Sequence, residues 1–171
     1  MNYPFLFKVL GNLDIEKLRK SLVFSGEKTT VWDDWQLHSA ESGLVREFLQ
    51  SQFSHLKIFR NTLFVSQGTQ SNFHIDRFHV YHLLHRILIP LDQDYRYEWV
   101  LNEKINSYQP KAGEVLLFNN MVPHRFASDN GKMREAVYLD LYDPLTEARL
   151  DEIKGNYSQE NAILEKKYSG L

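Results

Sequence analysis

Short runs of β-branched and aromatic residues, separated by turn residues, follow one another through the middle of the chain. These runs predict strands near residues 56–66, 71–76, 83–90, 95–101, 104–108, 113–119, 122–128 and 133–142. So many short, closely spaced strands are typical of a sandwich, a jelly roll or a barrel. The centre of the chain is therefore predicted to be mainly β.

Helical patterns lie on both sides of this β region. A strand is predicted at residues 5–9, followed by a helix that residues 12–14 cap and that runs to about Leu22. A further strand is predicted at 29–37, and Ser39 with Ser42 is expected to cap a second helix. We expect one domain over residues 1–171, with helices covering one outer face of the sheets. Its parts are N-terminal support at 1–55, a β core at 56–143 and a helical C-terminal tail at 144–171.

Charge and composition exclude several classes of protein. The 171 residues include 20 basic and 22 acidic side chains, a balance that gives no electrostatic footprint for nucleic acid or an anionic membrane. No apolar stretch is long enough to span a bilayer, and the short apolar N-terminus lacks the basic segment of a signal peptide. We expect a soluble, cytoplasmic protein without nucleic-acid or membrane partners. Cysteine is absent, so any metal must have nitrogen and oxygen ligands.

The clearest chemical signal is the segment HIDRFHVYHLLH, which holds four of the seven histidines and begins at His74. Residues i and i+2 of a strand point to the same face, so His74 and Asp76 can bind one cation. A histidine from a neighbouring strand completes a 2-His-1-carboxylate set, which leaves open positions on iron(II) for a chelating co-substrate and O₂. His124, which follows a strand and a turn, is the candidate third ligand. The other histidines of the segment, His79, His82 and His85, have i, i+3 spacing, which is also compatible with a partly buried face that has no role in metal binding.

Arg134, ten residues after His124, is the candidate anchor for that co-substrate. The turn signal at residues 129–131 predicts a hairpin between the two positions. A two-residue loop would place Arg134 on the opposite side from His124. A three-residue loop, with Gly131 in the left-handed conformation, pairs His124 with Ala136 and Arg134 with Phe126. We predict this second register because it separates an apolar face (Val137, Leu139, Leu141) from a polar face (His124, Phe126, Arg134, Ala136, Tyr138, Asp140).

In that register the guanidinium lies one rung from the metal ligand. A five-carbon dicarboxylate can then chelate the metal at one end and meet Arg134 at the other. Arginine suits this role because its planar fork binds a carboxylate through two hydrogen bonds.

Further motifs stand at regular distances from these residues. Gly68-Thr69 precedes His74 by six residues, and His85 follows His74 by eleven, within HRILIPL. The strand GEVLLFNN precedes His124, and AVYLDLYDP follows Arg134. In this order and spacing, residues 63–144 resemble the aspartyl/asparaginyl β-hydroxylase-like family of the Fe(II)/2-oxoglutarate-dependent oxygenase superfamily. They are also similar to small bacterial proline hydroxylases.

The resemblance implies a mainly β fold with flanking helices, a double-stranded β-helix of the jelly-roll, cupin-like kind. It also implies an enzyme, a non-haem iron dioxygenase that hydroxylates a C–H bond of an amino-acid side chain. The substrate would be a free amino acid or a peptide or protein. The cofactor would be Fe(II), with 2-oxoglutarate and O₂ as co-substrates and succinate and CO₂ as products.

The same resemblance implies roles for individual residues. Iron would be held by His74, Asp76 and His124, and 2-oxoglutarate would be bound by Arg134, with His85 beside it. The family's arginine is Leu83 here, which makes Arg86 its candidate replacement. The carboxylate of Asp76 favours hydroxylation, because halogenating relatives lack it to make room for chloride. The candidate substrate contacts are Arg86, Trp99 and Arg125.

Two other interpretations stay open. Residues 113–124 have the spacing of a cupin's second motif, so a cupin-like metalloenzyme that does not use 2-oxoglutarate is one alternative. However, Asn119 and Met121 stand where that motif usually has Pro and Gly, and such an enzyme does not need Arg134. The other alternative is a non-catalytic β-sandwich that binds partners through aromatic residues such as those of the WDDW segment at 32–35. The identity of the substrate, the position of hydroxylation and the oligomeric state also stay open.

Overall fold

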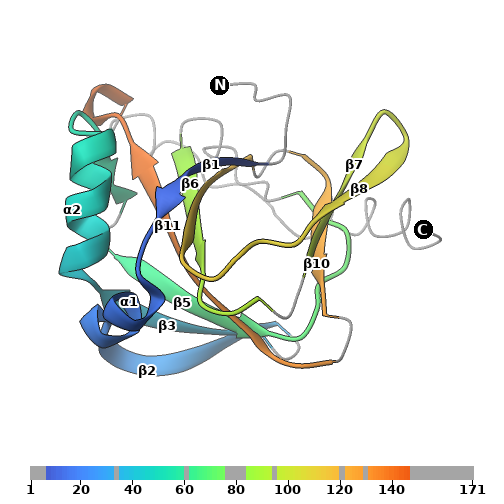
Figure 1. Cartoon of the computed structure of the whole chain (residues 1–171), viewed down its shortest axis with the longest axis horizontal. Coiled ribbons are helices and arrows are strands. Elements are labelled where there is room, and N and C mark those ends of the chain that lie inside the picture. The colour runs from blue at the N-terminus through green and yellow to red at the C-terminus, as the bar shows by residue number, and fades with distance from the viewer. Residues whose placement is uncertain are drawn as a thin grey trace.

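Two antiparallel β-sheets face each other, and two helices cover the outer side of the larger sheet (Figure 1). The computed structural model describes residues 7–32, 35–59, 62–75, 84–93, 96–119, 122–128 and 131–146. The predicted mainly β architecture with flanking helices is confirmed for these residues. None of the helices among them is long and apolar enough to cross a membrane.

The larger sheet has eight strands, and its central strand is the last one along the described chain. Seven strands follow the order β1 (Phe7–Asn12), β9 (Glu114–Phe118), β6 (Leu84–Pro90), β11 (Arg134–Tyr142), β5 (Leu63–Gly68), β3 (Trp35–Glu41) and β2 (Val23–Trp32). The short strand β4 (Lys57–Ile58) also pairs with β11. The smaller sheet has the order β10 (His124–Ala127), β7 (Arg96–Leu101) and β8 (Lys104–Tyr108).

Both helices begin where the sequence predicts. Helix α1 (Ile15–Ser21) is capped by Asp14, whose carboxylate accepts a hydrogen bond from the backbone N–H of Lys17 at 3.0 Å. Helix α2 (Gly43–Gln52) is capped by Ser42, whose hydroxyl accepts from the N–H of Val45. Ser39 lies in strand β3 and takes no part in the cap.

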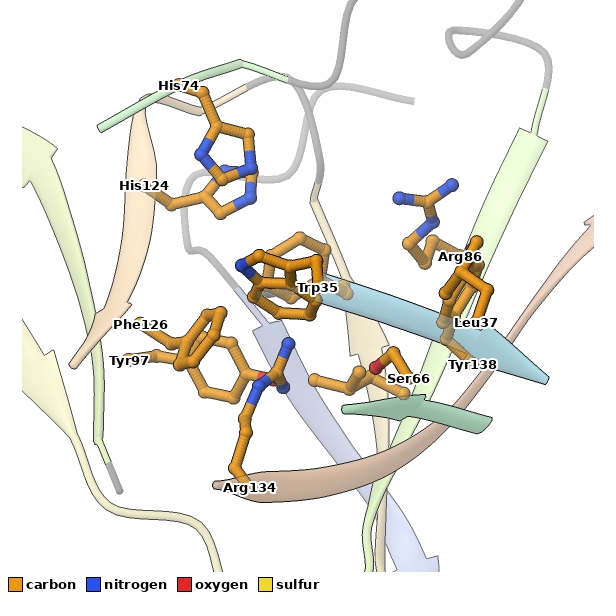
Figure 2. Close-up of a pocket in the computed structure, with 12 residues that line it drawn as sticks. Trp35, Leu37, Ser66, His74, Arg86, Tyr97, His124, Phe126, Arg134 and Tyr138 are labelled. Atoms are coloured by element: carbon orange, nitrogen blue, oxygen red, sulfur yellow. The ribbon is translucent and has the colours of Figure 1, made fainter. Parts of the chain in front are cut away.

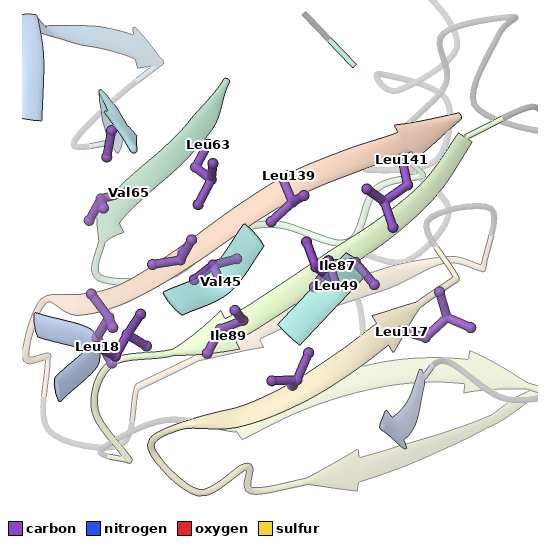
Figure 3. Packing of buried hydrophobic residues seen from close by; sticks show 14 residues of the cluster. Leu18, Val45, Leu49, Leu63, Val65, Ile87, Ile89, Leu117, Leu139 and Leu141 are labelled. Carbon is purple, nitrogen blue, oxygen red and sulfur yellow. The ribbon is translucent and has the colours of Figure 1, made fainter. Parts of the chain in front are cut away.

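Alternation along the strands of the larger sheet produces two faces of different character. Val137, Leu139 and Leu141 of β11 are buried against the helices, together with Ile87 and Ile89 of β6 (Figure 3). The opposite face of the sheet packs on the smaller sheet through an aromatic cluster that includes Trp35, Tyr97, Phe118 and Phe126. Burying the aliphatic face stabilises the sheet by about 25 cal/mol for each Å² of apolar surface removed from water. The aromatic face lines the space between the two sheets.

The predicted hairpin between residues 124 and 134 is wrong. Strand β10 pairs with β7, so that His124 faces Trp99, whereas β11 pairs with β5 and β6. Gly131 does adopt the predicted left-handed conformation, with φ of 65°. Strand β10 nevertheless belongs to the smaller sheet and β11 to the larger one. A turn motif of this kind describes the local backbone, and it does not say which strand the chain pairs with afterwards.

Several other strand predictions also differ from the structure. The strand predicted at 29–37 is two strands, β2 and β3, because the chain reverses between Trp32 and Trp35, which pair with each other. The strand predicted at 56–66 is divided into β4 and β5, and the one predicted at 71–76 is reduced to an isolated pairing of His74 with His124. Of the predicted C-terminal helix, residues 144–146 form one 3₁₀ turn, and residues 147–171 lie outside the described residues.

Candidate functional site

A pocket of about 650 Å³, counting the part open to solvent, lies between the two sheets. Its walls are mostly apolar and aromatic, contributed by Leu88, Phe118, Phe126 and others. Two histidines and two arginines also line it, namely His74, His124, Arg86 and Arg134 (Figure 2). Pockets with apolar walls and a few convergent polar groups are the usual form of small-molecule sites.

His74 and His124 are held side by side by their own backbones. The N–H of each residue donates to the carbonyl oxygen of the other at 2.9 Å, and the ring centroids are 4.5 Å apart. The two histidines are fifty residues apart in the sequence, but they are neighbours in the structure because His74 pairs with His124, the first residue of β10. The structure thus brings together the two histidines that the sequence proposes as ligands.

The ring nitrogens of this pair are arranged for metal binding. Nδ1 of His74 lies 2.7 Å from the carbonyl oxygen of Asn72, and Nδ1 of His124 lies 2.7 Å from that of Val122. A carbonyl oxygen only accepts hydrogen bonds, so each Nδ1 carries a proton, and in the neutral ring the lone pair is on Nε2. Metal-binding histidines are oriented in this way, with the second ring nitrogen donating to a backbone carbonyl.

The predicted carboxylate ligand, Asp76, lies outside the described residues. Within the described part of the chain, no group of three histidine, aspartate or glutamate side chains is close enough to hold a metal ion. Two imidazoles of the correct tautomer fit two positions of the predicted 2-His-1-carboxylate set. They fit a nitrogen- and oxygen-liganded metal, as the absence of cysteine requires.

Arg134 is buried among aromatic rings on the floor of the pocket (Figure 2). The carbon of its guanidinium lies 3.7 Å from the ring centre of Phe126 and 4.7 Å from that of Trp35. Its Nη1 donates a hydrogen bond to the hydroxyl of Tyr97 at 2.5 Å. The rings stabilise the cation and exclude water from it, and a carboxylate that reaches it is attracted more strongly than in water.

Tyr97 is a site residue that the sequence analysis missed, whereas Trp35 is named there only as part of the aromatic WDDW segment at 32–35. Trp35 comes from β3, outside the motif-bearing segment, and its indole N–H donates to the carbonyl oxygen of Gln70. The indole lies against the backbone of Gly68, where a Cβ atom would be only 2.8 Å from the ring. Tyr97 lies opposite Phe126 in the smaller sheet. Neither residue stands at a motif spacing that would identify it from the sequence. Tyr97 is placed at the site because β7 pairs with β10, so that its side chain lies on the same side of the smaller sheet as that of Phe126.

The structure does not bring His85 into the pocket. In β6 the side chains of Arg86 and Leu88 line the pocket, so His85 lies on the other face with Ile87. It pairs in register with Leu141, which belongs to the core beneath the helices. Burial lowers the pKa of His85 below its ordinary value. Strand alternation therefore turns Arg86 toward the pocket, where it was expected, and turns His85 away from it.

Arg86 is fixed at another side of the pocket by an aspartate on the neighbouring strand. Its Nε and Nη2 donate to the two carboxylate oxygens of Asp140 at 2.8 and 3.0 Å. The two residues are paired across β6 and β11, and both are largely buried. The guanidinium also lies over the ring of Tyr138, 5.1 Å from its centre. A two-pronged pair of this kind holds a guanidinium in one orientation.

The other two candidate substrate contacts lie on opposite faces of the smaller sheet. Trp99 is paired with His124 and packs on the ring of Phe7 at a centroid distance of 5.7 Å. Arg125 lies on the outer face, where its Nε donates to Glu98 at 2.7 Å. The structure therefore leaves Trp99 beside His124 and turns Arg125 away from the pocket.

Solved structures with similar folds include several oxygenases. HygX from Streptomyces hygroscopicus, solved with nickel, 2-oxoglutarate and hygromycin B, is 12% identical with a TM-score of 0.58, over 81% of this chain and 83% of that one. A prolyl hydroxylase in complex with a hypoxia-inducible-factor peptide, from Trichoplax adhaerens, is 17% identical with a TM-score of 0.58, over 84% and 86%. An oxidoreductase of the 2OG-Fe(II) oxygenase family from Burkholderia pseudomallei is 11% identical with a TM-score of 0.51, over 75% and 77%.

These similarities establish the fold. The chain is a double-stranded β-helix, as the sequence analysis predicts. No protein-family model and no curated protein matches the sequence. The aspartyl/asparaginyl β-hydroxylase-like subtype therefore stays a prediction.

Proposed function

We propose that this protein is a 2-oxoglutarate-dependent non-haem iron oxygenase that hydroxylates a C–H bond of an amino-acid side chain, free or within a peptide. The observation that carries the proposal is the shared pocket of the two histidines and Arg134. Nδ1 of each imidazole lies against a backbone carbonyl oxygen, which leaves Nε2 of the neutral ring to bind a metal, and the arginine is buried in the same pocket. The similar folds solved with 2-oxoglutarate, or as members of the oxygenase family, add support.

His74 and His124, together with Asp76, would hold the metal through Nε2 of each imidazole and one carboxylate oxygen. A ferrous ion in such a site supplies the chemistry that activates O₂ with 2-oxoglutarate as the reductant. The protein's own contribution is to fix the ligands. The carbonyl oxygens of Asn72 and Val122 keep each Nδ1 protonated, so the lone pair stays on the nitrogen that faces the metal.

Arg134 would bind the far carboxylate of 2-oxoglutarate, with the hydroxyl of Tyr97 as a second contact. The guanidinium and the carboxylate meet in a pocket walled by Trp35 and Phe126, from which water is displaced. An ion pair at 4 Å is worth about 1 kcal/mol in bulk water and about 4 kcal/mol at the effective dielectric constant of a protein surface. The aromatic surroundings therefore favour binding of a dianion at this position.

Arg86 is the proposed contact for the amino-acid substrate. Asp140 holds its guanidinium at the pocket wall in a fixed orientation, while the ring of Tyr138 supports it from one side. Trp99, next to His124 in the smaller sheet, is a second candidate contact. Both a free amino acid and a peptide fit this assignment.

The test is an anaerobic titration of the purified protein with Fe(II) and 2-oxoglutarate, followed by the weak visible charge-transfer band of that chelate. We expect the band in the wild type and its loss in His124→Ala. Arg134→Met should raise the Kd for 2-oxoglutarate roughly 30-fold to 1,000-fold, because truncating one partner of a buried ion pair costs about 2–4 kcal/mol.

Two matched controls accompany these variants. His38→Ala removes a histidine that stacks on Phe24 away from the pocket, and Arg19→Met removes an arginine whose ion pair with Glu135 is partly exposed. Both should retain the band. Iron binding without a band would favour a cupin-like enzyme that does not use 2-oxoglutarate, and the absence of iron binding would favour a binding protein. Either result overturns the proposal.

A further inference from the structure

We propose that Arg125 and Glu98 are positioning residues for the metal ligand His74. From the outer face of the smaller sheet, they hold Phe73 and thereby fix the segment that carries His74 against strand β10. The inference rests on the proposed function, because it assigns a role in metal binding. It also moves Arg125 from the substrate to the support of the metal ligands.

His74 needs such support because its segment is not a regular strand. Its backbone pairing with His124 is an isolated bridge. Ser71 adds two hydrogen bonds to β10: its N–H donates to the carbonyl oxygen of Phe126 at 3.1 Å, and its hydroxyl accepts from the N–H of Phe126 at 3.1 Å. The segment is thus joined to β10 by a bridge and not by a regular ladder, and local opening is easier where regular strand pairing is short.

Phe73 and Arg125 occupy the rung next to the two histidines. The antiparallel pairing of His74 with His124 places their neighbours, Phe73 and Arg125, opposite each other. Side chains alternate along both segments, so the histidines point into the pocket and this second pair points outward. Phe73 is buried, with 3% of its surface exposed, and the guanidinium carbon of Arg125 lies 4.4 Å from its ring centre. The arginine thus covers the ring from outside.

Glu98 fixes the guanidinium in that position. It faces Arg125 across β7 and β10, and its Oε2 accepts from Nε of Arg125 at 2.7 Å. Its Oε1 accepts from Nε of Arg96 at 2.7 Å, and the side chain is 9% exposed. Burial raises the pKa of Glu98, but the hydrogen bonds from Arg96 and Arg125 outweigh it and lower the pKa below the ordinary value. The carboxylate is therefore ionised when it orients Arg125.

These contacts form a continuous row across the outer face, from Phe73 through Arg125 to Glu98. The row runs perpendicular to the strands and ends in the full β7–β8 ladder, which is regular from Tyr97 to Leu101. The irregular segment is thereby connected to the most regular part of the smaller sheet. Loosening the row should let His74 move relative to His124 without disturbing either sheet.

The experiment compares Arg125→Met with Arg96→Met in the whole 171-residue chain. Both variants remove one of the two arginines that bind the same carboxylate, and each leaves the other arginine in place. The register places Arg96 opposite Ala127, two residues along β10 from Arg125. Co(II) serves as the probe, because its visible absorption reports both affinity and coordination geometry. We expect Arg125→Met to weaken Co(II) binding about 10-fold, the lower end of the loss caused by removing a direct partner of a metal ligand, because Arg125 acts through Phe73, and to alter the shape of the absorption band.

Two further variants separate positioning from stability. Phe73→Leu keeps a buried apolar side chain but removes the ring face, and should reproduce the effect of Arg125→Met. Arg125→Lys keeps the charge but lacks the planar fork that binds Glu98, and should give an intermediate loss. Hydrogen exchange in the metal-free protein adds a second readout. In Arg125→Met the amide of His74 should exchange faster, while the amides of the β7–β8 ladder should not change.

The outcomes distinguish this inference from the proposed function. If the wild type binds Co(II) and Arg125→Met binds it equally well, with unchanged exchange at His74, the positioning role is refuted while the proposed function stands. If Arg96→Met weakens binding as much as Arg125→Met, the effect belongs to Glu98 and the sheet in general, and the role of Phe73 is refuted. If the wild type binds no metal, the proposed function fails first, and the positioning role fails with it.

Discussion

Replacing Gly68 with alanine tests the packing that holds Arg134 in place. A Cβ at this position would lie 2.8 and 2.9 Å from two atoms of the Trp35 indole and 3.2 Å from a third, all closer than ordinary van der Waals contact. The indole cannot easily move away, because its N–H is bonded to Gln70 and its ring packs edge-on against Phe126 at 4.4 Å. Overpacking of this kind costs about 1–3 kcal/mol.

A smaller opposing effect must be subtracted. Gly68 is not one of the glycines with a positive φ, so alanine gains about 0.5–1 kcal/mol from the lower entropy of the unfolded chain. The expected net loss is therefore between about 0 and about 2.5 kcal/mol in the free energy of unfolding, measured by urea denaturation with circular dichroism. The affinity for 2-oxoglutarate should also fall, because Arg134 pairs with Gly68 and lies over the indole that must shift.

Gly43→Ala is the matched control. Gly43 is the first residue of α2, and a Cβ added there would meet no atom within 4 Å, so alanine should be neutral or slightly stabilising. If Gly68→Ala is as stable as Gly43→Ala and binds 2-oxoglutarate like the wild type, the indole does not constrain the arginine. The packing of Trp35 against Gly68 would then be incorrect.

Three further variants test the core, a helix cap and a buried histidine. Leu139→Ala should lower the free energy of unfolding by about 2–5 kcal/mol in urea denaturation, without changing ligand affinity, because Leu139 faces the helices and not the pocket. Ser42→Ala should cost about 1–2 kcal/mol by the same assay, because it removes the cap of α2 and a 2.6 Å hydrogen bond to Ser21. Burial lowers the pKa of His85 in the folded protein below its ordinary value of 6.5. Just below pH 6.5, His85 is therefore protonated in the unfolded chain but still neutral in the folded protein. Stability should therefore fall as the pH decreases below that value, and His85→Gln should show a smaller fall in urea midpoints between about pH 8 and about pH 5.

The parts of the fold that follow from local pattern are predictable from the sequence. Strands β6 to β11 lie close to the predicted ranges because each is a short apolar or alternating run bounded by turn residues. The caps at Asp14 and Ser42 are likewise local signals. The grouping of His124, Arg134 and Tyr138 on one pocket is also correct, although for a different reason from the one proposed. They converge because two sheets face each other, and not because two strands are paired.

The parts that depend on pairing between distant strands are not predictable in this way. The register between β10 and β7 and that between β11 and β6 decide which of two adjacent residues enters the pocket. For His85 the motif spacing predicts a place beside the co-substrate, but the alternation of β6 turns Arg86 and not His85 toward the pocket. Trp35 belongs to a strand that joins the sheet through β5, and its place over Arg134 depends on a pairing that no short motif encodes.

The central position of β11 has a consequence for how the protein acquires its pocket during synthesis. This strand is the last of the described chain, yet it lies between β5 and β6 and also pairs with β4. Until it leaves the ribosome, the two halves of the larger sheet have no strand to join them, and β5 and β6 each expose an unpaired edge. Pairings between distant segments form slowly, and exposed edges invite association with other chains. Arg134 is the first residue of this same strand, so joining of the sheet and placement of the carboxylate anchor occur in one late folding step.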